Sequence, residues 1–261
     1  MQLASATDSV ANREAVAQWA ERIEETGSRP DLVVFPEGAM HDFGPPDTDL
    51  SAVAEPLDGP YVGALAAAAR RLGATVVGGM FERSEDGHPF NTLVVVGPDA
   101  TVQDTYRKIH LYDSFGYAES ERLSAGDPVP VVVEIAGTAV GLMTCYDLRF
   151  PEMARKLIDS GAELLLVPSA WVAGPLKEDH WQVLLRARAI ENTVHVAAAA
   201  QTGRTYVGLS AVIDPLGIVL ASAGDEEGLV EATIDRERMR RARERNPSLA
   251  NRRLNVPVSP A

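Results

Sequence analysis

Apolar and polar positions along the chain follow two different periods, which predicts a protein that mixes helices with strands. Apolar residues recur at helical spacing over residues 12–26, and the alanine-rich segment 61–73 predicts a second helix that ends at Gly73. Short apolar runs at 31–36 (DLVVFP) and 75–80 (TVVGGM) are typical of buried strands. The first third of the chain therefore predicts α/β alternation.

The middle of the chain is rich in strand-forming side chains. Two β runs flank a Gly-Pro-Asp turn at 97–99, which predicts a hairpin within 91–113. Residues 129–145 repeat this pattern around a turn at Gly137. This part of the chain therefore predicts antiparallel strands rather than helices.

The second half of the chain again alternates between both kinds of element. We expect a helix from Pro151, a strand in 163–171, an amphipathic helix over 179–193, and β segments at 195–203, 206–224 and 228–235. No repeat, low-complexity segment or Pro/Ser-rich linker interrupts the 261 residues, so we expect a single domain over 1–261. Two sheets, each covered by helices on one face, would accommodate so many β runs. The expected fold class is α/β.

The composition is that of a soluble globular protein, with 46% hydrophobic and 23% charged residues. Cys145 is the sole cysteine, so an internal disulfide cannot form, and a reducing compartment is favoured. The first residues lack the basic and apolar regions of a signal peptide, and no apolar run approaches the ~20 residues that span a bilayer. We therefore expect a cytoplasmic protein without a membrane partner.

The charge balance argues against a nucleic-acid partner. Lys and Arg number 24 against 37 Asp and Glu, which gives a net charge of -13. The one basic cluster, RERMRRARER at 236–245, has acidic residues interleaved with its arginines at helical spacing. We interpret residues 236–261 as a C-terminal helix and tail that is solvated or takes part in subunit contacts.

Three apolar strands end in side chains that together supply covalent chemistry. Glu37 follows LVVFP, Lys108 lies in TYRKIHLYD, and Cys145 follows GLMT. Taken alone, each has an ordinary structural explanation: a turn residue, a lysine that extends to solvent, and a small buried hydrophobe. Together they provide a base, a fixed cation and a nucleophile, the minimum for covalent acyl transfer.

These segments, FPEG, YRKIHLYD and CYDLRFPE in that order, resemble the three signature segments of the nitrilase (carbon-nitrogen hydrolase) superfamily. Further similarity at 117–127, 180–192 and 208–217 extends the match over nearly the whole chain. The sequence is most similar to the Nit-type amidases, the branch that includes omega-amidase and deaminated-glutathione amidase. This resemblance implies a four-layer αββα sandwich, a Glu-Lys-Cys triad and a homodimer that extends the sandwich across the subunit interface.

The resemblance also assigns roles by position. Cys145 is the implied nucleophile, Glu37 the general base and acid, and Lys108 the cation. A free thiol titrates near 8.5, so a nearby ammonium and a carboxylate that accepts the proton are needed to make thiolate at neutral pH. Lys108 and the backbone N–H of Tyr146 would stabilise the oxyanion that forms when the thiolate attacks an amide carbonyl.

Three further residues are candidates for the site. Glu119 matches a glutamate that the family holds near the lysine and the substrate, although by propensity alone it is a surface loop acid. Arg149 matches an arginine that holds the remote carboxylate of the substrate in similar amidases, and its alternative is an ion pair with Glu152 or Asp147. Trp171 is expected to flank the pocket or to pack against it.

Histidine and metal chemistry are weaker alternatives. His110 lies two residues after Lys108 and so on the same strand face, which permits a Cys-His dyad in principle, and His180 is another candidate base. The five histidines are scattered, and none has the spacing of a metal site. We expect neither a metal nor a cofactor.

The sequence departs from the family pattern at two places. The chain starts at MQLAS, so most of the usual first strand is missing, and we expect added upstream apolar residues to raise the melting temperature. Tyr-Asp follows Cys145, where true nitrilases have Trp-Glu, and Leu148 occupies a position that differs in carbamoyl hydrolases. The expected function is hydrolysis of a small linear, carboxylate-bearing amide to an acid and ammonia. The alternatives are an N-carbamoyl hydrolase, a nitrilase, or a catalytically silent binding protein.

Overall fold

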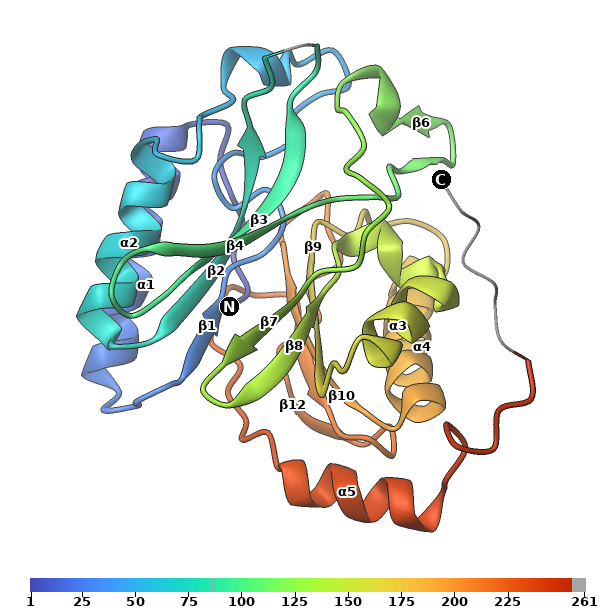
Figure 1. Cartoon of the computed structure of the whole chain (residues 1–261). Helices are drawn as coiled ribbons and strands as arrows, with labels where there is room; N and C mark the ends of the chain where they lie inside the picture. Colours follow the sequence, from blue (N-terminus) through green and yellow to red (C-terminus); the bar gives the residue numbers. More distant parts are fainter. Residues whose placement is uncertain (86, 255–261) are drawn as a thin grey trace.

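The computed structural model describes residues 1–85 and 87–254, and its first half builds a four-stranded sheet. The strand order is β1-β2-β3-β4, with β1 parallel to β2 and the other neighbours antiparallel. The strands are β1 (Leu32–Val34), β2 (Thr75–Glu82), β3 (Phe90–Val96) and β4 (Val102–Arg107). Helices α1 (Ser9–Glu25) and α2 (Pro60–Leu72) cover the outer face of this sheet (Figure 1).

The second half builds a six-stranded sheet in the order β12-β11-β10-β9-β8-β7. The strands are β7 (Val132–Ile135), β8 (Thr138–Leu142), β9 (Leu164–Ser169), β10 (His195–Ala200), β11 (Ala211–Ile213) and β12 (Val219–Ser222). Helices α3 (Pro151–Asp159) and α4 (Lys177–Asn192) pack on its outer face, against β8, β10 and β11. The two sheets lie between the two helical layers, which confirms the αββα sandwich.

Alternation along the strands places side chains in two cores. In β3, Leu93 and Val95 face the core between the two sheets, whereas Val94 and Val96 face the core beneath α1 and α2. All four side chains are fully buried. A strand that is buried on both faces reads as a continuous apolar run, as this one does.

Several short elements connect the longer ones, and some of them line the mouth of the site. A two-residue hairpin joins β5 (Asp113–Ser114) to β6 (Tyr117–Ala118) through Phe115 and Gly116, which both have positive φ. Three 3₁₀ helices lie at Leu50–Ala52, Glu119–Glu121 and Cys145–Arg149. The last two carry site residues: Glu119 follows β6 directly, and Cys145 lies three residues after β8.

The β segment expected at 228–235 is wrong. Its pattern suits a strand, but within 228–235 only Gly228 forms a β-bridge: its N–H donates to Gln2 at 2.9 Å and its carbonyl accepts from Gln2 at 2.8 Å. At the start of the chain, Leu3 forms one further parallel bridge, to Gln201 after β10. The residues before α1 therefore join the sheets through single bridges rather than a strand.

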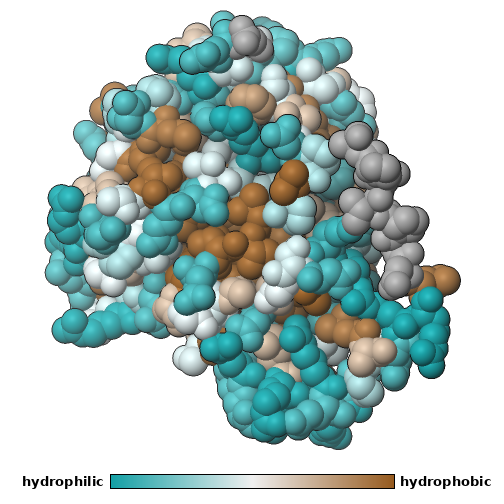
Figure 2. All heavy atoms as spheres, in the orientation of Figure 1, coloured by the Kyte–Doolittle hydropathy of each residue, from teal (hydrophilic) through white to brown (hydrophobic). Residues whose placement is uncertain are grey.

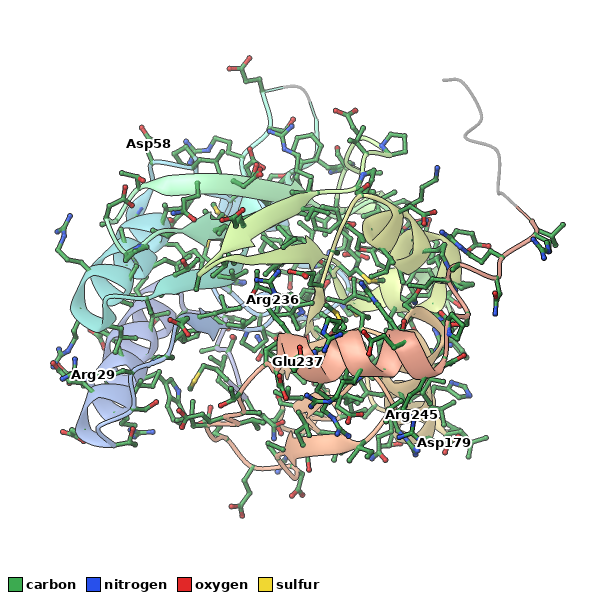
Figure 3. All side chains as sticks on the ribbon, turned by 60° about the horizontal axis from the view of Figure 1, so that its bottom comes forward. Arg29, Asp58, Asp179, Arg236, Glu237 and Arg245 are labelled. Carbon is green, nitrogen blue, oxygen red and sulfur yellow. The ribbon has the colours of Figure 1, made fainter. Side chains whose placement is uncertain are left out.

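The expected C-terminal helix is α5 (Arg236–Arg245), which lies across the end of the molecule with Arg236 and Arg245 near its two ends (Figure 3). Met239 and Ala242 are its buried side chains, and Figure 2 shows the hydrophilic surface that α5 presents to solvent. On the same face, apolar surface gathers around edge strands β4 and β7 (Figure 2). Residues 255–261 of the expected tail lie outside the described residues. No helix in the described part of the chain is long and apolar enough to cross a membrane.

Candidate active site

The structure brings the three strand-end residues together where the two sheets meet. Glu37 follows β1, Lys108 follows β4 directly, and Cys145 lies three residues after β8. Both charged side chains are only 1% exposed. Gly79 of β2 permits the close approach of the β1 segment, because a Cβ there would lie 2.7 Å from the Cα of Glu37.

A buried ion cluster holds these residues in place. The Nζ of Lys108 lies 2.9 Å from Oε1 of Glu37 and 2.8 Å from Oε2 of Glu119. Glu119 is itself only 1% exposed, although its propensity suggested a surface loop. Two carboxylates and one ammonium therefore share a site that solvent does not reach, which is stable only when each charge has partners.

Three neutral donors complete the cluster, and sequence reasoning missed all of them. The backbone N–H of Tyr112 donates to Oε2 of Glu119 at 2.6 Å. The side-chain amide of Asn91, in β3, donates to Glu37 at 2.7 Å and to Glu119 at 3.2 Å. The backbone N–H of Ala170, after β9, donates to Oε2 of Glu37 at 2.6 Å. Both oxygens of Glu37 are thus fixed, and its carboxylate has one orientation.

Burial and the charges of the cluster shift the pKa values of its groups. Burial opposes the charge of Lys108, but Glu119 and Glu37 together raise its pKa well above the ordinary value. Burial raises the pKa of Glu119 despite the nearby ammonium. Burial also raises the pKa of Cys145 well above the ordinary value, and Glu37 adds to the rise while Lys108 offsets part of it. Cys145 is therefore a thiol at rest, and its attack requires a base.

The backbone of Cys145 has a positive φ, a conformation that non-glycine residues rarely adopt. Its φ is +46°, at the start of the 3₁₀ helix Cys145–Arg149. The buried carboxylate of Asp147 fixes this turn, because it accepts from the Thr144 N–H at 2.8 Å and from the Tyr106 hydroxyl at 2.6 Å. The nucleophile position is thus held by hydrogen bonds rather than by flexible packing.

The histidine alternatives do not assemble. Nδ1 of His110 lies 2.7 Å from Asp147, and its ring stacks on Phe150 with centroids 3.8 Å apart. His180 lies 3.4 Å from Arg149. Neither ring contacts Cys145 in the described contacts. Within residues 1–85 and 87–254, no cluster of His, Cys, Asp or Glu is placed to hold a metal ion.

A cavity of about 560 Å³ opens above Cys145. Besides the residues around Cys145, its walls come from the loops 41–50, 112–122 and 171–179 and from Thr205 and Tyr206. The backbone N–H of Tyr146 belongs to the first turn of a helix, where N–H groups lack intrahelical partners. The volume suits a small molecule.

Arg149 and Trp171 line this cavity. Among the ion pairs of the described residues, none joins Arg149 to Glu152 or Asp147. Instead the guanidinium lies over the Trp171 ring at 4.8 Å, and its buried Nε has no hydrogen-bond partner in the described part of the chain. Trp171 is fixed by a hydrogen bond from Nε1 to the Lys177 carbonyl at 2.9 Å. One wall therefore presents a cation that is free to meet an anionic group.

Comparisons with known proteins show a hydrolase that acts on carbon–nitrogen bonds other than peptide bonds. The chain belongs to the carbon-nitrogen hydrolase family, whose model matches residues 1–244.

Two curated relatives cover most of the chain. A hydrolase of Mycobacterium tuberculosis is 40% identical and covers 100% of this chain and 96% of the relative. The deaminated glutathione amidase of Escherichia coli O157:H7 is 42% identical and covers 87% of this chain and 86% of the relative.

Solved structures agree with this membership. A superfamily protein of Xanthomonas campestris, with an arsenic adduct in its active site, has a TM-score of 0.88 at 32% identity and covers 99% of this chain and 97% of its own. A mutant amidase of Nesterenkonia sp. AN1 carries acrylamide added to its active-site cysteine, with a TM-score of 0.80 at 26% identity and 96% coverage of both chains.

Proposed function

We propose that this protein is an amidase that hydrolyses a small linear amide bearing a carboxylate to an acid and ammonia through a thioester on Cys145. The observation that carries the proposal is the buried thiol beside a fixed carboxylate and ammonium, at the base of a cavity whose wall holds Arg149. The relative named as a deaminated glutathione amidase supports the amide as the substrate class.

The first half-reaction forms the thioester. Glu37, whose charge acts on the Cys145 thiol, takes its proton as the sulfur attacks the amide carbon. The negative charge that develops on the carbonyl oxygen is stabilised by Lys108 and by the backbone N–H of Tyr146. Glu37 then gives its proton to the amide nitrogen, the C–N bond breaks, and ammonia leaves.

The second half-reaction hydrolyses the thioester, with Glu37 again acting first as base and then as acid. Glu37 removes a proton from a water molecule, which attacks the thioester carbon and forms the C–O bond of the acid. The C–S bond breaks and the proton returns from Glu37 to the sulfur. Glu119 keeps Lys108 in position throughout, since its carboxylate accepts from Nζ at 2.8 and 3.1 Å. Arg149, with Trp171 beneath it, holds the remote carboxylate of the substrate.

The test is a product assay with three substrate classes. Purified protein is incubated with succinamate, with N-carbamoyl amino acids and with aliphatic nitriles, and ammonia and carbon dioxide are measured. We expect ammonia alone from succinamate and none from the variant Cys145→Ala. Carbon dioxide together with ammonia would assign an N-carbamoyl hydrolase, consumption of a nitrile would assign a nitrilase, and no turnover of any class would assign a binding role.

We also propose a cytoplasmic homodimer. The single free cysteine supports a reducing compartment. Ile190 on α4 and Leu216 and Ile218 on the adjoining turn are 45%, 48% and 51% exposed, an apolar surface that a second subunit would bury. Light scattering should give twice the chain mass of 28.0 kDa, and a monomer would refute the dimer.

A further inference from the structure

Besides Lys108 and Arg149, the cavity wall holds another cation, which has no role in the proposed reaction. Lys177, the first residue of α4, is 5% exposed and lines the cavity together with Arg149. Its Nζ donates to the Tyr112 hydroxyl at 3.1 Å, and no ion pair joins it to a carboxylate within residues 1–85 and 87–254. An ammonium in such a place is costly unless an anion meets it.

The two cations gather around the same aromatic rings. Nζ of Lys177 lies 5.2 Å from the centre of the Trp171 ring, and the guanidinium of Arg149 lies 4.8 Å from it. Phe115, at the tip of the β5–β6 hairpin, is 4.4 Å from Nζ and 5.7 Å from the guanidinium. Burial and the charge of Arg149 lower the pKa of Lys177, as expected for two like charges without an anion.

We propose that Lys177 is a specificity-determining residue that binds, together with Arg149, the carboxylate of the substrate. One carboxylate oxygen accepts from the guanidinium and the other from the ammonium, while the rings of Trp171 and Phe115 exclude water and close the sides. The cavity therefore selects amides whose far end is a carboxylate over neutral amides of the same shape. This inference rests on the proposed amidase function.

The side chain of Lys177 can be replaced without loss of the hydrogen bonds that shape the loop around it. The hydrogen bonds that shape the loop use backbone atoms: the Lys177 carbonyl accepts from Trp171, and the Lys177 N–H donates to the Gly174 carbonyl at 3.0 Å. Lys177→Met keeps these contacts and the length of the side chain but removes its charge. Lys156→Met, at a half-buried lysine of α3 that is absent from the cavity wall, is the matched control.

The test compares glutaramate with 4-nitrobutanamide, which has the same shape but a neutral nitro group in place of the carboxylate. For Lys177→Met we expect KM for glutaramate to rise at least about tenfold, because the substrate loses one hydrogen bond from a charged donor. The kcat should stay within about threefold of wild type. KM for 4-nitrobutanamide should not change, Lys177→Arg should restore most of the affinity for glutaramate, and Lys156→Met should match wild type.

Three kinetic outcomes would overturn the inference. An equal loss for both amides, or a loss confined to kcat, would show that Lys177 acts on the site through Tyr112. Unchanged kinetics would show that it binds no anion. If wild type turns over neither amide, calorimetric titration with glutarate decides the matter: binding that weakens in Lys177→Met supports the anion site, and equal binding refutes it.

Discussion

Removal of the ammonium from the buried cluster should separate its structural from its chemical contribution. Lys108→Met leaves Glu37 and Glu119, both 1% exposed, without a counter-charge. Breaking a buried ion pair by removal of one partner costs about 3–5 kcal/mol. At roughly 2–4 °C per kcal/mol for a chain of this size, the melting temperature should fall by about 6–20 °C.

The loss should depend on pH in a defined direction. Burial already raises the pKa of Glu119 in the wild type, and removal of Lys108 raises it further. A group whose folded pKa is raised contributes stability that is present at low pH and lost as pH increases through that pKa. The deficit of Lys108→Met relative to wild type should therefore be larger at pH 8 than at pH 5, measured by urea unfolding with circular dichroism.

A second substitution provides the control. Lys108→Met/Glu119→Gln removes one of the two carboxylates, so the double variant should regain part of the free energy of unfolding at pH 8. Its kcat should stay about 10²–10³-fold below wild type, since the oxyanion still lacks its cation. A variant Lys108→Met that is as stable as wild type at pH 8, or whose deficit grows on acidification, would refute the electrostatic account of the cluster.

Two other variants test the base and its support. Glu37→Gln should lower kcat about 10²–10⁴-fold, because the Cys145 thiol loses the base that takes its proton as the sulfur attacks; a kcat within about threefold of wild type would contradict this role. Asn91→Ala removes the donor shared by Glu37 and Glu119, so the free energy of unfolding should fall by about 1–3 kcal/mol and kcat/KM by roughly tenfold; an unaltered enzyme would show that the amide is dispensable.

The sequence alone predicts the parts of the site that lie at strand ends. Glu37 and Cys145 each follow an apolar run, whereas Lys108 follows β4, a mostly polar and partly exposed strand, so what the three share is a position just after a strand. The partner of Asn91 could not be counted from the hairpin turn. A regular count from the Gly-Pro-Asp turn pairs Asn91 with Arg107, but an irregularity between Val95 and Val96 shifts the register by one residue, which puts Asn91 opposite Lys108.

Other features depend on the tertiary structure. Ala170 donates to Glu37 through its backbone N–H, which almost any residue could supply. The pattern of side chains in the sequence therefore does not predict this contact. In the sequence, Lys177 is an ordinary polar residue at the start of a helix. Only the tertiary structure places its side chain in the cavity wall. The expected strand at 228–235 has a suitable pattern but finds no sheet edge beyond Gln2, because strand formation needs a partner as well as a propensity.

The most direct test of the central claim is the intact mass of the enzyme after rapid quenching during turnover of a carboxylate-bearing amide. Cys145 is the sole cysteine, so a thioester can form at one position only. The account predicts a wild-type species heavier by the acyl group, with ammonia released, and neither signal in Cys145→Ala. Ammonia release that persists in Cys145→Ala would contradict the thioester mechanism.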